Sequence, residues 1–347
     1  MAEGKKNITI TRSLLLVLLI AAFSAGAFVG RAGWLLGTAY DSGMSEVPSG
    51  KPGEFRFIRP LQTGGERNAA RPAPALRPFR YKVKALIEDR MKDGRALSVS
   101  VYFRDLSGGL YFGIHDQETF SSEGLLKLPL MIAYFKMAES DRRLLKKKLT
   151  FNGGMSGEKN FADLYEPLVP GKPYSVDDLI FRMIVHDDED ARALLSVNIL
   201  PEYLDRVFKD VYVNYDPQHH DAPVPFSAYA SFYRALYHAS YLNKAMSEKA
   251  LHYLSRSAFE NRIASGIPSN IDCAFKFGER TITPAANAST PNTSLEQVHV
   301  FGIVYLPNRP YLMGVMARGQ DRTTLKTLVR DITTFLFEEV DHQTQTG

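Results

Sequence analysis

The sequence is poor in the residues that build disulfides, metal clusters and nucleic-acid sites. It has one cysteine, Cys273, among 347 residues, which excludes an intrachain disulfide and a thiolate metal cluster. Its neighbours are mostly apolar, so we expect a buried strand residue rather than a catalytic thiol. The formal net charge is only +4 and the basic residues are scattered, so we expect no nucleic-acid partner. No internal repeat is evident.

Histidine does not supply a metal site either. His219, His220 and Asp221 are consecutive, but two adjacent histidines of a strand or helix cannot face one ion. No cysteine or third histidine lies nearby, so we predict a solvated loop without zinc. The sequence indicates no other cofactor.

The N-terminal segment is typical of an exported protein. A basic flank within 1–12 precedes an uncharged, apolar stretch at 13–30, about 18 residues and just long enough to cross a bilayer. This arrangement predicts a cytoplasmic N-terminus and an extracytoplasmic remainder. The small residues at 25–27 also fit the cleavage site of a signal peptide. We favour an uncleaved signal-anchor at 13–36, because residues 28–30 extend the apolar run beyond the possible cleavage site and Trp34 fits the membrane interface.

A linker and one domain are expected after this segment. Residues 37–79 are rich in proline, glycine and charge, as in a linker, and 55–61 reads as a short strand that docks on the domain. Residues 80–342 form a unit of roughly 260 residues, a common size for a single domain.

The order of elements in this domain predicts a mixed α/β (α+β) fold. Strands near both ends of the domain, with helices between them, imply an antiparallel sheet built from both chain ends, flanked by helices and accompanied by an all-helical lobe. The expected elements are a helix at 81–92, strands at 97–104 and 110–114, a central helical block, strands at 298–306 and 311–318, and a helix at 325–340.

The run at 120–134 carries the first functional motif. It is apolar nearly all round, as in a buried core helix, and contains Lys127 near its start. It resembles the catalytic helix of serine β-lactamases and penicillin-binding proteins, whose Ser-x-x-Lys signature places a nucleophilic serine one turn before an activating lysine. The residue three before Lys127 is Gly124. The attacking oxygen is therefore absent at its expected position.

Two upstream serines offer an alternative nucleophile. Ser122 precedes Lys127 by five residues, which turns it about 140° away around a helix, and Ser121 is more distant still. Both residues fit better as helix N-caps.

The second family motif, Ser-Asp-Asn, aligns with an acidic run. By register Asp187 takes the serine position, Asp188 keeps the aspartate and Glu189 takes the asparagine position. The resemblance implies that serine relays a proton and asparagine holds the substrate amide, whereas two carboxylates would repel an anionic substrate. The alternative, which we favour, is that 187–190 is an acidic helix N-terminus complementing the helix dipole.

The third motif, Lys-Thr-Gly on an edge strand, appears as Lys276-Phe277-Gly278. The resemblance implies that Lys276 supplies positive charge, and that Phe277 and Gly278 line the cleft, with glycine permitting close approach of a substrate backbone. The N–H groups of Glu279 and Gly124 would form an oxyanion hole. The family's Glu-x-x-Leu-Asn, which directs water in class A enzymes, is not found between the second and third motifs.

These departures leave three hypotheses. The first is a membrane-tethered, extracytoplasmic β-lactamase-like domain that is catalytically impaired and binds cell-wall peptide or an envelope protein as a scaffold. The second is an active serine hydrolase that uses Ser121 or Ser122 on β-lactams, D-Ala peptides or esters. The third is an unrelated envelope domain in which the lysine-containing helix is coincidental.

Overall fold

The computed structural model describes residues 55–60, 74–94, 96–120, 126–154, 166–214, 216, 224–257, 266–282 and 294–346. Within these ranges no helix is both long and apolar enough to cross a membrane. The anchor predicted at 13–36 lies outside them, as do Ser121, Ser122 and Gly124.

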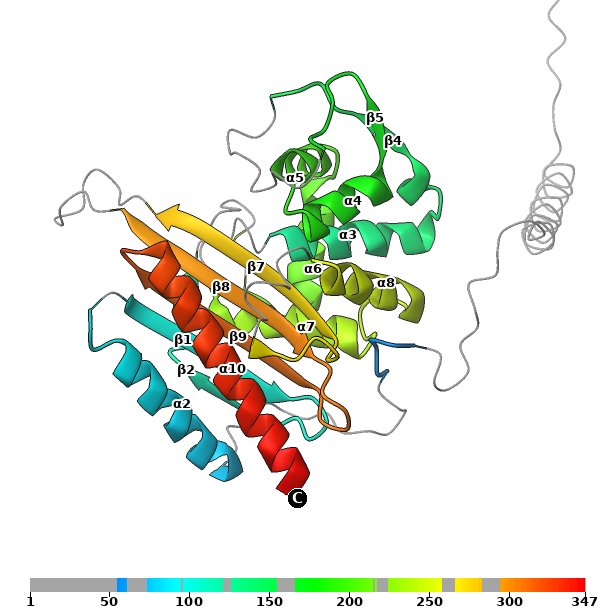
Figure 1. Ribbon diagram of the computed structural model, residues 1–347. Coiled ribbons are helices and arrows are strands. Elements are labelled where there is room, and N and C mark those ends of the chain that lie inside the picture. Colours follow the sequence, from blue (N-terminus) through cyan, green and yellow to red (C-terminus); the bar gives the residue numbers. More distant parts are fainter. Residues whose placement is uncertain are drawn as a thin grey trace, which may run out of the picture. The chain divides into compact units, whose positions relative to one another are not determined.

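An antiparallel five-stranded sheet in the order β2-β1-β9-β8-β7 organises the domain (Figure 1). Strands β1 (Ala96–Asp105) and β2 (Tyr111–Ile114) come from the first part of the domain, and β7 (Cys273–Ile282), β8 (Leu295–Val304) and β9 (Tyr311–Gly319) from its end. Strand β1 joins the two groups because it pairs with both β2 and β9. The predicted sheet from both chain ends is confirmed.

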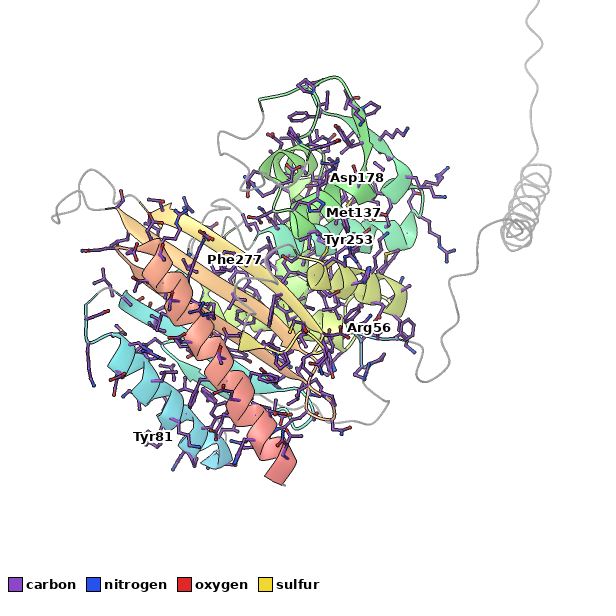
Figure 2. The ribbon with its side chains drawn as sticks, in the orientation of Figure 1. Arg56, Tyr81, Met137, Asp178, Tyr253 and Phe277 are labelled. Atoms are coloured by element: carbon purple, nitrogen blue, oxygen red, sulfur yellow. The ribbon has the colours of Figure 1, made fainter. Side chains whose placement is uncertain are left out.

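One face of the sheet is covered by α2 (Arg77–Arg90) and α10 (Arg322–Thr346) (Figure 1). Alternate residues of β1, such as Val101 and Phe103, are buried in the same core as Val83 of α2 and Leu336 of α10. This is the two-residue period that the sequence predicts. Tyr81, on the outer side of α2, is exposed (Figure 2).

The other face carries the helical lobe. Its helices are α3 (Lys127–Ser140), α4 (Val176–Val185), α5 (Glu189–Ser196), α6 (Pro201–Asp210), α7 (Tyr229–Tyr237) and α8 (Lys244–Ser255), and short strand pairs join β3 (Thr119–Phe120) to β6 (Val224–Pro225) and β4 (Lys148–Thr150) to β5 (Pro173–Ser175). Helix α3 is buried on nearly every side from Lys127 to Phe135, as expected of a core helix. It begins at Lys127 with Leu126 at the N-cap position, so the prediction that Ser121 or Ser122 caps it is wrong.

Residues 55–60 dock on the domain, although they form bends rather than the predicted strand. The carboxylate of Glu248 on α8 accepts hydrogen bonds from the backbone N–H groups of Arg56, Phe57 and Ile58 at 2.8 to 3.1 Å. The Arg56 guanidinium also donates to both carboxylate oxygens of Asp272 at 2.6 and 2.8 Å, and Figure 2 places this arginine beside α8. This middle part of the predicted linker at 37–79 is therefore fixed to the lobe.

Candidate functional site

Lys127 is the first helical residue of α3, and its side chain is 0% exposed. Its Nζ donates to the Oδ1 atom of Asp187 at 2.7 Å and to the carbonyl oxygen of the same residue at 3.1 Å. It also forms an ion pair with Glu189. The ammonium group of Lys127 is thus enclosed by oxygen acceptors.

Lys276 reaches the same carboxylate from the sheet. It lies on β7, an edge strand as predicted, and points to the lobe face because its neighbours Phe275 and Phe277 are buried in the core on the opposite face. Its side chain is 2% exposed, and its Nζ donates to the Oδ1 atom of Asp187. A single carboxylate oxygen therefore bridges the lysines of the first and third motifs.

Asp187 occupies the turn between α4 and α5 with a φ of 57°. This left-handed conformation is rare for residues with a side chain and is tolerated best by aspartate and asparagine. Its side chain is 36% exposed, more than either lysine that it contacts. Asp187 is the member of the cluster through which solvent reaches the bridge.

Glu189, the first residue of α5, completes the cluster. Its carboxylate pairs with Lys127 and accepts a hydrogen bond from Arg192 Nε at 2.5 Å. Asp187 and Glu189 together carry two negative charges, and the side chains paired with them, Lys127, Lys276 and Arg192, carry three positive charges. We predicted that these carboxylates would repel an anionic substrate, but in the structure the adjacent basic side chains offset their charge.

The pKa values follow from this arrangement. Burial alone would raise the pKa of Asp187, but the charges of Lys276 and Lys127 outweigh it and lower that pKa to about 2. Burial opposes the charged form of Lys127, but Asp187 and Glu189 raise its pKa above the ordinary lysine value. For Lys276, burial is the larger effect and lowers the pKa, and the nearby Lys127 adds to the lowering.

Asp188 does not join the lysines. Its side chain is buried at the N-cap of α5 and accepts a hydrogen bond from Ala191 N–H at 3.0 Å, and burial raises its pKa. The interpretation of the acidic run as a helix N-terminus is therefore correct for Asp188, and incomplete for Asp187 and Glu189, which bind the buried lysines.

The other residues of the third motif differ from expectation. Phe277 packs into the core under α10, so the prediction that it lines the cleft is wrong. The Glu279 carboxylate binds Arg322 at 3.5 Å and Lys326 at 2.5 Å, on the side away from Lys276. An oxyanion hole between the Glu279 and Gly124 N–H groups stays a prediction because Gly124 lies outside the described residues.

His299 is a site residue that sequence reasoning missed. It pairs with Gly278 across β7 and β8, and a Cβ atom at position 278 would lie 2.3 Å from its ring. The glycine is therefore required by His299 whether or not a substrate approaches. Burial, with a further contribution from Lys276, lowers the pKa of His299 to about 3, so its ring is neutral at pH 7. Only the strand register, unknown from sequence, identifies this neighbour.

No group of three potential metal ligands occurs among the residues that the structure describes. His219, His220 and Asp221 lie outside them. The described side chains therefore offer an ion-pair cluster and no metal centre.

Comparison with known proteins agrees with this geometry. The model of the β-lactamase enzyme family matches residues 78–340, so the hypothesis of an unrelated envelope domain is wrong. No curated protein sequence matches the chain.

Several solved structures share the fold. The structure of PBP-A is 17% identical, with a TM-score of 0.63, and the match covers 79% of this chain and 98% of that one. A β-lactamase from Sphaerobacter thermophilus is 18% identical, with a TM-score of 0.61 and coverage of 74% and 95%. A serine-to-glycine variant of the TLA-1 extended-spectrum β-lactamase is 14% identical, with a TM-score of 0.60 and coverage of 75% and 98%.

Proposed function

The chain belongs to the β-lactamase enzyme family, and we propose that it is a member without serine acyl-transfer activity that acts as a binding or scaffold module. Two losses support this proposal. The sequence has glycine at position 124, where the family has its nucleophile. The lysine that would activate a nucleophile is held in ion pairs.

The bridge at Asp187 is the observation that carries the proposal. A lysine acts as a general base only when it has lost its proton. Asp187 and Glu189 raise the pKa of Lys127, so it stays protonated at neutral pH. A hydroxyl placed beside it would meet an ammonium group with no free lone pair.

The ligand that we propose is a cell-wall peptide or an envelope protein outside the cytoplasm, with the chain tethered through residues 13–36. Among the side chains in contact with Lys127 or Lys276, that of Asp187 is the most exposed, at 36%. It favours an amine of such a ligand over a carboxylate, because the lysines already have counter-ions.

Covalent labelling with a fluorescent penicillin tests the loss of activity. A PBP-A variant is known as an acyl-enzyme complex with penicillin G, so the probe suits this fold. We expect no adduct in the wild-type chain or in Gly124→Ser, whose lysine remains paired. We expect an adduct in Gly124→Ser/Asp187→Ser/Glu189→Asn, which restores the family residues. The control Gly124→Ala/Asp187→Ser/Glu189→Asn lacks only the hydroxyl and should stay unlabelled.

The alternative is an active hydrolase with a displaced nucleophile. It predicts a wild-type adduct that mass spectrometry maps to Ser121 or Ser122, and that disappears in Ser121→Ala/Ser122→Ala. Such an adduct would overturn the proposed loss of activity.

The tether is tested separately by fractionation. We expect the full chain in the membrane fraction, from which detergent but not alkaline carbonate releases it. We also expect that protease digests the domain when it is added to cells whose outer envelope has been made permeable. Deletion of residues 13–36 should move it to the soluble fraction. Recovery of the intact full chain in the cytosol would contradict the tether.

A further inference from the structure

A second charged cluster lies on the lobe face of the sheet, on strand β1 rather than on β7. Arg104 of β1 shares this face with Tyr102, two residues earlier. Its side chain is 3% exposed, and its Nη1 atom is buried without a hydrogen-bond partner among the described residues. The Nε atom of Arg234, on α7, is buried and unpartnered within the same part of the chain.

Aromatic contacts bring the two arginines to one place. The ring of Phe301 on β8 stacks with Tyr102 at 5.8 Å and with Tyr233 at 5.6 Å between centroids, which sets α7 and its Arg234 over this face. Tyr111 on β2 pairs with Arg104 in the strand register, and the guanidinium carbon lies 5.9 Å from the centre of the tyrosine ring.

The positive charge of this cluster is not balanced. Among the described residues neither Arg104 nor Arg234 forms an ion pair. Asp105, which follows Arg104, pairs with Arg309 at 3.2 Å and accepts hydrogen bonds from the N–H groups of the next turn. It is therefore already bonded to other groups.

Electrostatics agrees with the geometry. Burial lowers the pKa of Arg234, and the charge of Arg104 lowers it further. Burial also lowers the pKa of His238, at the end of α7, and both arginines add to that effect. An arginine does not escape this repulsion by losing its proton, because the guanidinium group stays charged in proteins. Burying such charges without a counter-ion is strongly unfavourable.

We propose that Arg104 and Arg234, with Tyr102 and Tyr111 beside them, bind a small dianionic oxyanion of the phosphate or sulfate type. Guanidinium groups donate paired hydrogen bonds to such oxygens. Two unpaired positive charges match a dianion, whereas a single carboxylate would leave one unbalanced. The site does not depend on the proposed loss of acyl-transfer activity.

Solvent reaches one wall of the site. Tyr111 also lines a surface pocket of about 390 Å³, together with Arg77, Arg80 and Asp116. The pocket has two basic residues and one acidic residue. Because Arg77 and Arg80 lie on α2, the pocket opens on the α2 side of edge strand β2, beside Tyr111.

Thermal unfolding of the full chain in detergent tests the proposal, with inorganic phosphate or sulfate added at constant ionic strength. An anion that binds only the folded state stabilises it by mass action. We therefore expect the wild-type melting temperature to rise by a few degrees and then level off once the anion concentration is well above its dissociation constant. Arg104→Met should lose this response. The control Arg142→Gln removes an exposed arginine outside the cluster and should respond like the wild type.

A second measurement separates binding from a structural role. In chloride alone, Arg104→Met should melt at or above the wild-type temperature, because an unpaired buried charge has been removed. Arg234→Met is the independent variant if Arg104→Met does not fold. An unchanged phosphate response in both variants, or no response in the wild type, would overturn the proposal. A response to glycerophosphoglycerol alone would also overturn it, because this phosphodiester carries a single negative charge and the proposed ligand carries two.

Discussion

Replacing Asp187 with asparagine tests whether the cluster of Lys127, Asp187, Glu189 and Lys276 stabilises the fold. Asp187→Asn keeps the shape of the side chain and tolerates the left-handed backbone, but removes the negative charge shared by Lys127 and Lys276. Both lysines are almost completely buried. The substitution would leave Glu189 as the remaining carboxylate in contact with Lys127.

The expected loss follows from the charges and the exposure. The pKa of Asp187 falls from 3.8 to about 2, which corresponds to about 2 kcal/mol. The Asp187 side chain is 36% exposed, and solvent screening reduces this contribution. Removing one partner of a fully buried pair costs about 3–5 kcal/mol. For this partly exposed bridge we expect about 2–3 kcal/mol.

Equilibrium unfolding in urea measures the loss, with far-UV circular dichroism as the probe. Asp187→Asn/Lys276→Met is the matched control, because it removes one charge of each sign from the bridge. We expect its free energy of unfolding to return to within about 1 kcal/mol of the wild type. A single variant within about 0.5 kcal/mol of the wild type, or a double variant less stable than the single one, would refute the reasoning.

The same variant has a distinct pH dependence. The folded pKa of Asp187 lies below its unfolded value of 3.8, so the carboxylate stabilises the fold above that pH and the contribution is lost as the pH falls through about 2. The stability difference between the wild type and Asp187→Asn should therefore narrow over this interval. A constant difference would mean that the substitution acts through packing rather than charge.

Three further substitutions probe the supports of the site. Asp188→Ala should lower the free energy of unfolding by about 1 kcal/mol, because Ala191 N–H loses its N-cap acceptor, whereas Asp188→Asn should cost less. Glu248→Gln should loosen residues 55–60, and trypsin cleavage after Arg56, followed by mass spectrometry, should be roughly tenfold faster because losing one charge-assisted bond costs about 1.5 kcal/mol. Gly302→Ala should lower the urea midpoint by the equivalent of about 1–3 kcal/mol, because its Cβ would lie 2.2 Å from a backbone oxygen.

Much of the fold could be predicted from the sequence because its signals are local. The two-residue alternation identified β1, and the continuous apolar run identified α3 as a core helix. The same alternation places Phe277 on the opposite face of β7 from Lys276. The wrong prediction that Phe277 lines the cleft therefore came from the family motif and not from the alternation of the strand.

The site itself depends on contacts that the sequence does not encode locally. Asp187 is 60 residues from Lys127 and 89 from Lys276, and in the sequence its acidic neighbours fit the N-terminus of the helix that they begin. A local argument therefore assigns all of these carboxylates to the helix dipole. The bridge becomes visible only when α3, β7 and the turn before α5 are placed together, and the same is true of His299.

The two basic clusters of the lobe face argue that charge balance, more than the identity of single residues, determines where this domain binds. Lys127 and Lys276 are retained from the family pattern, and each carries a counter-ion supplied by Asp187, so an anion entering there would have to displace a bonded carboxylate. Restoring the serine alone would not change that balance, which is why we expect activity to require three substitutions together. Arg104 and Arg234 present the opposite case, since a buried and a half-buried charge without an acidic partner among the described residues gain free energy from an external anion. The carboxylates of Asp187 and Glu189 thus occupy the lysines of the family motifs, while the arginine pair has no carboxylate to displace.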